Sequence, residues 1–341
     1  GASVIITDNA TGVRSNQYGF YSITLPAGSY TLQASFAGYL SAAIEVNLQS
    51  PLQYDFNLLP KDFLEAVTVT AGRGNVNVRQ SQLGKIDLSM TQVKSVPVVL
   101  GETDILKTLQ LMPGVSNAGE GNTGLYIRGG GADQNLIMLD DAIVYNTGHL
   151  FGFFSVFNGD AIKNISLFKG GMPAQYGGRL SSVLDVSMKE GNMKEFEAEG
   201  GIGLIASRIS IQGPVKKDKA SFIVSARRTY IDVLIKPFIG KESAYRGSGY
   251  YFYDLNTKIN YKFSEKDRVY LSGYFGRDVF SFNNNRENFR LNTPWGNATA
   301  TTRWNHVFNS RLFSNLTFVY NDYGFEFAAA QKDFVQRLTS G

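Results

Sequence analysis

The chain has 341 residues, of which 43% are hydrophobic and 13% aromatic, and its formal net charge at pH 7 is +4. Lys and Arg are interspersed with Asp and Glu and form no basic stripe, which argues against nucleic-acid binding. Cysteine is absent and there are only two histidines, so disulfides and Cys-ligated metal sites are excluded. No run approaches the roughly 18 apolar residues of a membrane-spanning helix, although amphipathic transmembrane strands would escape that test.

Residues 1–60 are predicted to form a small β-sandwich, because turn signals separate short runs in which apolar and polar residues alternate. The phrase YGFYSITLPAGSYTLQASFAGY resembles the carboxypeptidase-regulatory-like module, although the module's usual first strand is missing here. An immunoglobulin-like sandwich of another kind remains an equal alternative.

Residues 61–95 are predicted to be a polar linker with one extended patch. Val and Thr alternate in this patch and favour an extended backbone. Its residues are Glu65, Ala66, Val67, Thr68, Val69 and Thr70. Two interpretations are open: the patch is a strand of the following domain's sheet, or its backbone pairs with an edge strand of another protein.

A helix is predicted over residues 102–112, because Thr103 or Asp104 can cap it and its apolar residues share one face. The Pro-Gly pair that follows ends the helix. A second short helix is expected over residues 152–162.

The stretch 123–190 is rich in glycine and carries four short β-runs. These runs lie at 123–128, 135–140, 162–169 and 182–189. Glycine permits turns with positive φ and lets two backbones approach closely. Such a composition suits a small domain that is enclosed by another structure.

Four segments of this stretch resemble the plug domain of TonB-dependent outer-membrane receptors. They are LYIRGG, NLIMLDDAIVYN, ISLFKGG and YGGRLSSVLDVSMKEG, in that order. The resemblance covers about residues 63–192, and we expect the plug itself at 96–192. It implies an α+β plug inside a transmembrane antiparallel β-barrel, which has twenty-two strands in the family.

Long amphipathic strands are predicted after residue 192. In residues 255–263, Leu, Thr, Ile, Tyr and Phe share one face, while Asn and Lys share the other. A soluble sandwich or a barrel whose apolar face meets lipid would both give this pattern. Further strands are predicted at 195–205, 207–213, 221–230, 268–280, 298–308 and 312–325.

The connections between these strands favour the barrel. Short connections at 215–219, 264–267 and 309–310 alternate with long ones at 231–249 and 281–295, as is typical of outer-membrane barrels. About seven strands is an odd number that cannot close a bacterial barrel. We therefore expect residues 193–341 to be the N-terminal part of a truncated barrel.

The sequence predicts no catalytic site, metal site or cofactor, and no enzyme activity. It lacks a GxxxxGK[ST] phosphate loop, and IRGGG does not open a helix. Asp140 and Asp141 are adjacent on a strand and point to opposite faces. We interpret them as a pair that caps a turn.

The resemblance implies a lock between plug and barrel. The family uses the Arg of an IRG motif, here Arg128, and the Arg of an RGP motif, which pair with barrel glutamates. This chain has Lys169 at the second position, and lysine cannot form a bidentate pair with a carboxylate. Arg179 is a candidate replacement, and surface solvation is the alternative for both arginines.

The resemblance also implies a ligand-facing loop at the plug apex, with Tyr145, Asn146, His149 and Phe151. The alternative is that His149 and Phe151 pack beneath the apex. The patch at 65–70 would then be the TonB box, on which TonB pulls.

The function implied is TonB-dependent import of a nutrient or chelate through a plugged barrel in the outer membrane of a Gram-negative bacterium. The N-terminal domain would lie in the periplasm. The expected partners are TonB with its inner-membrane energising complex, outer-membrane lipid and a ligand that the sequence does not identify, and a surface lipoprotein lid is left open. A structural or assembly role of the same architecture, without transport, is the alternative.

Overall fold

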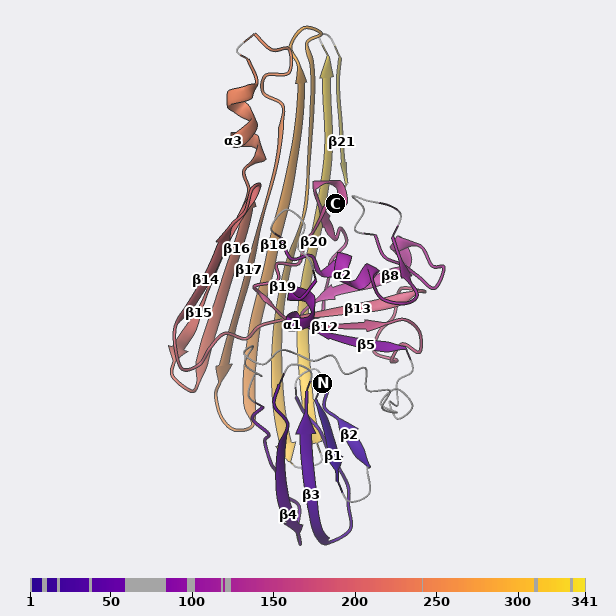
Figure 1. The fold of residues 1–341 in the computed structure, drawn as a ribbon, viewed down its shortest axis with the longest axis vertical. Helices are drawn as coiled ribbons and strands as arrows, with labels where there is room; N and C mark the ends of the chain where they lie inside the picture. Colours follow the sequence, from indigo (N-terminus) through magenta and orange to yellow (C-terminus); the bar gives the residue numbers. More distant parts are fainter. Residues whose placement is uncertain are drawn as a thin grey trace. The chain divides into compact units, whose positions relative to one another are not determined.

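The computed structural model describes residues 2–7, 11–16, 19–36, 39–58, 84–96, 102–117, 119, 124–240, 242–309, 312–331 and 334–340. The described chain is mainly β (Figure 1). It divides into two compact units, one of residues 1–81 with 306–314 and one of residues 82–305 with 315–341. The candidate TonB box at 65–70 lies outside the described residues.

The first unit contains a four-stranded antiparallel sheet in the order β2-β1-β3-β4. Its strands are β1 (Ser3–Ile6), β2 (Gly12–Arg14), β3 (Gly28–Ser35) and β4 (Ala42–Leu48). Ile6, Leu32 and Val46 form a small buried cluster. In β3, the alternation of apolar and polar residues that was predicted within residues 1–60 buries Leu32 and Ala34.

The second unit contains a five-stranded sheet, called here the plug sheet, in the order β5-β12-β13-β8-β9. Its strands are β5 (Lys85–Ser89), β8 (Asn135–Leu139), β9 (Ala142–Ile143), β12 (Ile162–Phe168) and β13 (Ser182–Met188). The pair β13–β8 is parallel and the other pairs are antiparallel. β8 is buried along its whole length, which explains its continuous apolar sequence.

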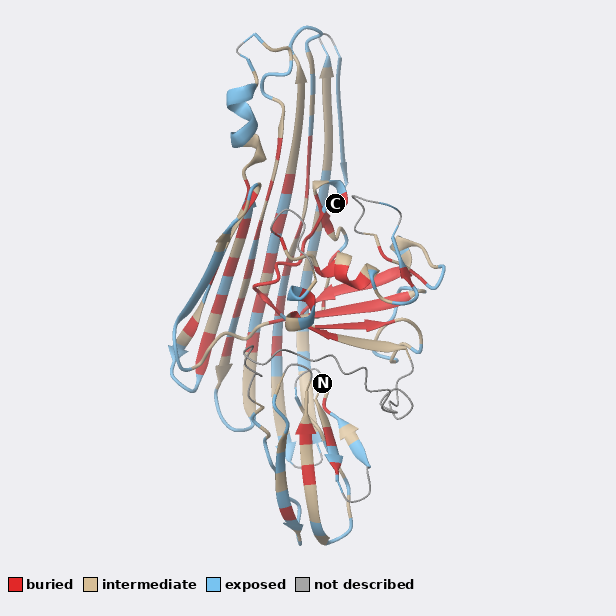
Figure 2. Cartoon of the chain, viewed as in Figure 1, coloured by how far each residue is buried: buried red, intermediate tan, exposed pale blue. Residues whose placement is uncertain are grey.

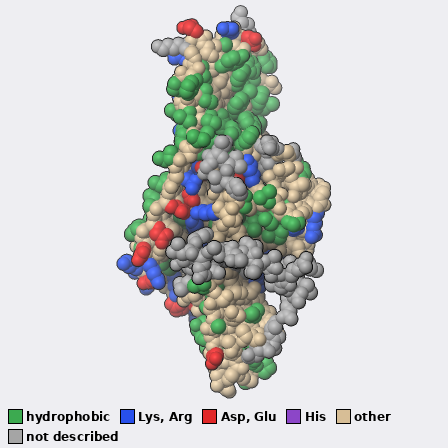
Figure 3. All heavy atoms as spheres, in the orientation of Figure 1, with side chains coloured by type: hydrophobic (Ala, Val, Ile, Leu, Met, Phe, Trp, Pro, Cys, Tyr) green, Lys and Arg blue, Asp and Glu red, His purple; other side chains and the backbone are tan. Residues whose placement is uncertain are grey.

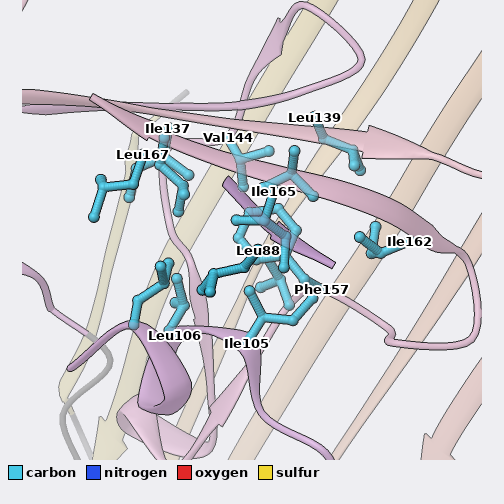
Figure 4. Packing of buried hydrophobic residues seen from close by; sticks show 14 of the residues in the cluster. Leu88, Ile105, Leu106, Ile137, Leu139, Val144, Phe157, Ile162, Ile165 and Leu167 are labelled. Atoms are coloured by element: carbon cyan, nitrogen blue, oxygen red, sulfur yellow. The ribbon is translucent and has the colours of Figure 1, made fainter. Parts of the chain in front are cut away.

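Two short helices cover one face of the plug sheet. The helix α1 (Met90–Lys94) begins with a capping box between Ser89 and Gln92, and Asp104 caps α2 (Ile105–Gln110). Side chains of α2 pack with those of the strands in one apolar cluster (Figure 4). The predicted helix at 102–112 is confirmed with shorter bounds, whereas α1 lies in the stretch predicted to be a linker.

The helix expected at 152–162 is not formed. A 3₁₀ turn, η3 (Leu150–Gly152), is followed by β11 (Phe154–Ser155), which pairs with β10 (Gly148–His149). Phe154 and Phe157 are buried in different apolar clusters. These aromatic side chains are therefore placed by contacts on separate sides of the chain rather than on one helical face. The remaining short elements are β6 (Val115–Ser116), β7 (Tyr126–Ile127) and η2 (Ala132–Gln134).

Eight strands in chain order form a second sheet, called here the wall sheet. They are β14 (Glu197–Ile202), β15 (Ala206–Lys216), β16 (Ala220–Thr229), β17 (Gly249–Lys262), β18 (Asp267–Asn284), β19 (Phe289–Asn309), β20 (Leu312–Gln331) and β21 (Phe334–Ser340). The sequence indicated about seven strands, and β21 is the additional one.

The connections of the wall sheet agree only in part with the prediction. The connection between β16 and β17 is long and contains α3 (Ile231–Ile235) and η4 (Lys236–Phe238). The long connection expected at 281–295 is wrong, because β18 and β19 continue to Asn284 and Phe289 and leave a tight turn. No helix formed by the described residues is long and apolar enough to cross a membrane.

Candidate functional site

The wall sheet turns its polar side chains toward the plug and its apolar side chains away from it. On β17, Asp254, Asn256, Lys258 and Asn260 are buried, whereas Leu255 and Ile259 between them are exposed. The same alternation is visible along the neighbouring strands (Figure 2). Because polar residues are inside and apolar residues outside, the sheet is reversed relative to a soluble sandwich.

Asp140 and Asp141 fasten the plug sheet to two different wall strands. Nζ of Lys258 on β17 lies 2.9 Å from Oδ2 of Asp140, and Nη2 of Arg303 on β19 lies 2.5 Å from Oδ2 of Asp141. Asp140 also accepts a hydrogen bond from the backbone N–H of Met188. The two carboxylates do lie in a turn, as expected, but each has a barrel cation as its partner.

A second group of ion pairs joins the helix side of the plug to β15 and β16. Nε of Arg208 lies 2.7 Å from Oδ2 of Asp160, and Nη1 of Arg227 lies 3.6 Å from Oε2 of Glu102. Arg227 also donates to the backbone oxygen of Ser155. These contacts hold the plug on β15 and β16. Asp140 and Asp141, called here the aspartate turn, bind instead to β17 and β19.

The end of the plug is anchored where the chain passes to the wall. The carboxylate of Glu190 pairs with Arg268 at 3.1 Å and with Lys163 at 3.6 Å. Burial by itself would raise the pKa of Glu190, but these cations hold it down to about 2. The backbone oxygen of Glu190 accepts hydrogen bonds from Ser221 and Asn260.

Residues 145–153, called here the apex loop, meet the wall through His149. Its Nδ1 lies 2.7 Å from Asp278 and its Nε2 lies 3.1 Å from Asp254. The imidazole is 1% exposed and stacks on Phe252. His149 was expected to face a ligand, and the structure instead buries it against β17 and β18. The open alternative, packing beneath the apex, describes its position.

The other predicted apex residues lie at the surface of the same loop. Tyr145 and Phe151 are 54% and 62% exposed, and Asn146 binds the amide of Asn297 through its backbone oxygen. Phe151 packs its ring edge against Phe280, at 5.4 Å between ring centroids. Exposed aromatic and amide groups at this loop are able to contact a ligand.

Of the predicted lock residues, Arg128 and Lys169 lie near each other, and none of the three has a carboxylate partner in the described part of the chain. Arg128 is exposed, and its backbone is in the left-handed conformation. The pKa of Lys169 is lowered, first by burial and then by the nearby positive charge of Arg128. Lys169 donates to the backbone oxygen of Pro113, and Arg179 donates to that of Gly178.

Five of the plug–wall ion pairs place the acidic residue on the plug and the basic residue on the wall, whereas Lys189–Glu199 and the contacts of His149 with Asp254 and Asp278 have the opposite polarity. The plug residues are Glu102, Asp140, Asp141, Asp160 and Glu190, and the wall residues are Arg208, Arg227, Lys258, Arg268 and Arg303. Cations on the polar face of a predicted strand, such as Lys258, were the available signal, because such a face must meet either water or a buried partner.

In Figure 3, many charged side chains lie across the middle of the view, while hydrophobic side chains cover much of its upper part, below a few charged side chains at the tip. Within the described residues, no three His, Asp or Glu side chains are arranged to hold a metal ion. The arrangement binds one domain to another.

Comparison with known proteins gives two domain matches. A model of the CarboxypepD_reg-like domain matches residues 1–71, and a model of the TonB-dependent Receptor Plug Domain matches residues 91–182. The TonB-dependent transporter Oar of Myxococcus xanthus is 23% identical over 208 residues, which cover 56% of this chain and 19% of Oar. The chain thus spans about a fifth of the length of this curated relative.

Solved structures share the fold. The outer membrane transporter YddB from Escherichia coli aligns with a TM-score of 0.53 at 11% identity, over 75% of this chain and 42% of YddB. The siderophore receptor PirA from Pseudomonas aeruginosa aligns with a TM-score of 0.49 at 17% identity, over 76% of this chain and 47% of PirA. The chain thus contains a CarboxypepD_reg-like domain followed by a plug domain of the type found in TonB-dependent receptors, and it shares the fold of an outer membrane transporter.

Proposed function

We propose that the whole protein is a TonB-dependent transporter of the outer membrane, in which the plug gates the uptake of a nutrient or chelate. The observation that carries this proposal is the chemistry of the plug–wall interface. The interface is formed largely by ion pairs and polar contacts, whereas most of the plug's apolar side chains pack inside the plug itself.

Such an interface suits a plug that moves. When it opens, water can solvate the separated charges, and the plug's main apolar cluster remains covered. A plug fused to its wall by a continuous apolar surface would instead expose that surface to water, at roughly 25 cal/mol per Å². Interfaces between parts that move relative to one another are generally more polar than permanent ones.

The outward face of the wall supports a position in the outer membrane. Its exposed apolar side chains match a lipid environment. They include Ile209, Ile211, Val224, Leu255, Ile259, Leu271 and Phe275. We propose that the N-terminal domain and the segment at 65–70 face the periplasm, where TonB acts.

Roles at the plug follow from its contacts. We propose that Asp140, Asp141 and Asp160 form the lock with the wall, and that Tyr145, Asn146 and Phe151 contact the ligand. Arg128, Lys169 and Arg179 remain a predicted second lock.

The test of the function is the substitution Val69→Pro in the full-length protein, with Val69→Ala as its matched control. Proline removes a backbone N–H and prevents strand pairing, whereas alanine keeps the N–H. We expect Val69→Pro to abolish binding of the purified periplasmic domain of TonB, and Val69→Ala to bind like the native protein.

Uptake provides the second readout of the same two variants. We expect Val69→Pro to insert into the outer membrane normally and to lose TonB-dependent growth on the cognate ligand. Normal growth of the Val69→Pro strain would contradict transport driven through this segment and would favour the scaffold role.

A further inference from the structure

The imidazole of His149 contacts a carboxylate through each of its ring nitrogens. Asp278 of β18 faces Nδ1 at 2.7 Å, and Asp254 of β17 faces Nε2 at 3.1 Å. A neutral imidazole has one N–H and one lone pair, so one of its nitrogens would place a lone pair against a carboxylate. Both contacts are favourable only when both nitrogens carry protons.

The neighbouring groups do not supply another cation to Asp278. From β17, the hydroxyl of Tyr250 donates to Asp278, as does the backbone N–H of Leu150. From β16, Arg227 is directed to Asp254, at 2.7 Å, and is shared with Glu102. Tyr274 of β18 is buried nearby and its hydroxyl has no hydrogen-bond partner among the described residues.

A cationic His149 halves the excess negative charge of this cluster. Asp254, Asp278 and Glu102 contribute three negative charges and Arg227 one positive charge, while Arg208 near Glu102 mainly pairs with Asp160. Buried carboxylates without a counter-charge are strongly unfavourable. The side chain at 149 is therefore the group whose charge decides whether this contact holds.

The backbone beside His149 is held in an unfavourable conformation. Leu150 and Phe151 have φ values of 51° and 54°, in the left-handed region that disfavours residues other than glycine. The backbone N–H of Leu150 lies within hydrogen-bond distance of both Tyr250 and Asp278. The contacts of this cluster thus maintain the strained segment, and the segment is able to relax when they are lost.

We propose that His149 is a protonated latch that fastens the apex loop to β17 and β18, and that loss of its proton releases the loop. The latch stands on this geometry and does not depend on which ligand is transported. Its chemical trigger is proton concentration, which distinguishes it from the ion pairs of the aspartate turn.

The direction of the pH dependence follows from the charges. Burial lowers the pKa of His149, but Asp278 and Asp254 outweigh burial and raise the pKa above the ordinary 6.5. The stability that the latch contributes is therefore fully present below the unfolded-state pKa and is lost as pH rises through the folded-state pKa. Acid protonation of the two carboxylates would open the latch at the opposite extreme.

The test uses a nitroxide label in the full-length protein, in which these 341 residues have no cysteine and any cysteine elsewhere is replaced by serine. The label is placed on Phe153→Cys in the apex loop, and a reference label is placed on the exposed Ala174→Cys outside it. Mobility is measured from about pH 6 to about pH 10, a range that spans a raised histidine pKa. We expect the label at 153 to become several-fold more mobile as pH rises and the label at 174 to stay constant.

Two histidine variants assign the response. His149→Gln should make the label at 153 mobile at every pH, whereas His306→Gln, at the other histidine of these 341 residues, should leave the pH response unchanged. A pH response that survives in His149→Gln, or an immobile label throughout the native titration, would overturn the proposal.

A direct measurement reads the protonation of His149 in the native protein. With ¹⁵N-histidine labelling, the imidazole signal that is present in the native protein and missing from His149→Gln should show two protonated nitrogens at pH 7.5, about one unit above the ordinary histidine pKa. A neutral tautomer under these conditions would contradict the latch.

Discussion

Asp140 and Asp141 are adjacent in the sequence yet bind cations on two different wall strands. Both adopt left-handed φ values, 47° and 71°, which carry the chain through the turn between β8 and β9. Asp140 can therefore pair with Lys258 while its neighbour Asp141 pairs with Arg303. One short turn fixes the plug sheet against two strands.

The pair Asp140–Lys258 is the best site for a measurement of the lock. Both side chains are at most 5% exposed, so Lys258→Met leaves a buried carboxylate unpaired and should destabilise the seated plug by about 3–5 kcal/mol. The double variant Asp140→Asn, Lys258→Met should recover most of that loss. Denaturant-dependent hydrogen exchange at residues 135–144 measures both effects.

A matched control lies on the same strand. Lys262 pairs with Glu265, which is 81% exposed, and Lys262→Met should change stability by less than about 1 kcal/mol. Equal effects of Lys258→Met and Lys262→Met would show that the aspartate turn does not hold the plug.

Strands β12 and β13 of the plug sheet carry buried polar groups among their apolar ones. Asp185 on β13 lies opposite Ser166 on β12, and the hydroxyl of Tyr176 donates to its carboxylate. Burial, and next the charge of Asp141, raise the pKa of Asp185 to about 6. The sheet therefore contains a carboxylate that is more readily charged in the unfolded chain.

Asp185→Asn should stabilise the plug, with a pH dependence of known sign. The folded-state pKa is above the unfolded one, so the native Asp185 lowers stability progressively as pH rises from about 4 to about 6. The gain from asparagine should be about 2–3 kcal/mol at pH 8 and near zero at pH 3. Thermal unfolding of both proteins at the two pH values measures it; a gain that is larger at pH 3 would contradict the assignment.

The sequence predicted the long elements well and the short irregular ones poorly. The β-runs at 135–140, 162–169 and 182–189 agree with β8, β12 and β13, because burial on both faces gives them unbroken apolar character. The segment 152–162 is also largely apolar, but Phe154 packs with the wall while Phe157 packs in the plug. Local pattern does not reveal that division.

Site residues were harder to predict for a related reason. Pairs such as Asp141–Arg303 join residues that are 162 positions apart, so their meeting depends on the register of the wall against the plug. The polarity of each face was readable from the alternation in residues 255–263. The pairing of individual charges across the interface could not be read in the same way, because no local sequence feature determines it.

At the scale of the whole molecule, a core domain is enclosed by a sheet of reversed polarity. The plug has its own apolar cluster, and the wall contributes mainly polar and charged groups toward it. The apolar side chains that a soluble protein would bury face outward on the wall instead. This reversal is the central claim, because the proposed gating, the proposed lock and the proposed position in the membrane all require it.

Neighbouring residues of β17 test the reversal most directly. In the cysteine-free chain, a fluorophore on Ile259→Cys or on Asn260→Cys reports the two faces of one strand, of which Ile259 is 46% exposed and Asn260 is buried. In lipid bilayers that contain nitroxide-labelled acyl chains, the label at 259 should be strongly quenched and the label at 260 should not. Quenching at 260 and not at 259, or at neither position, would contradict the account.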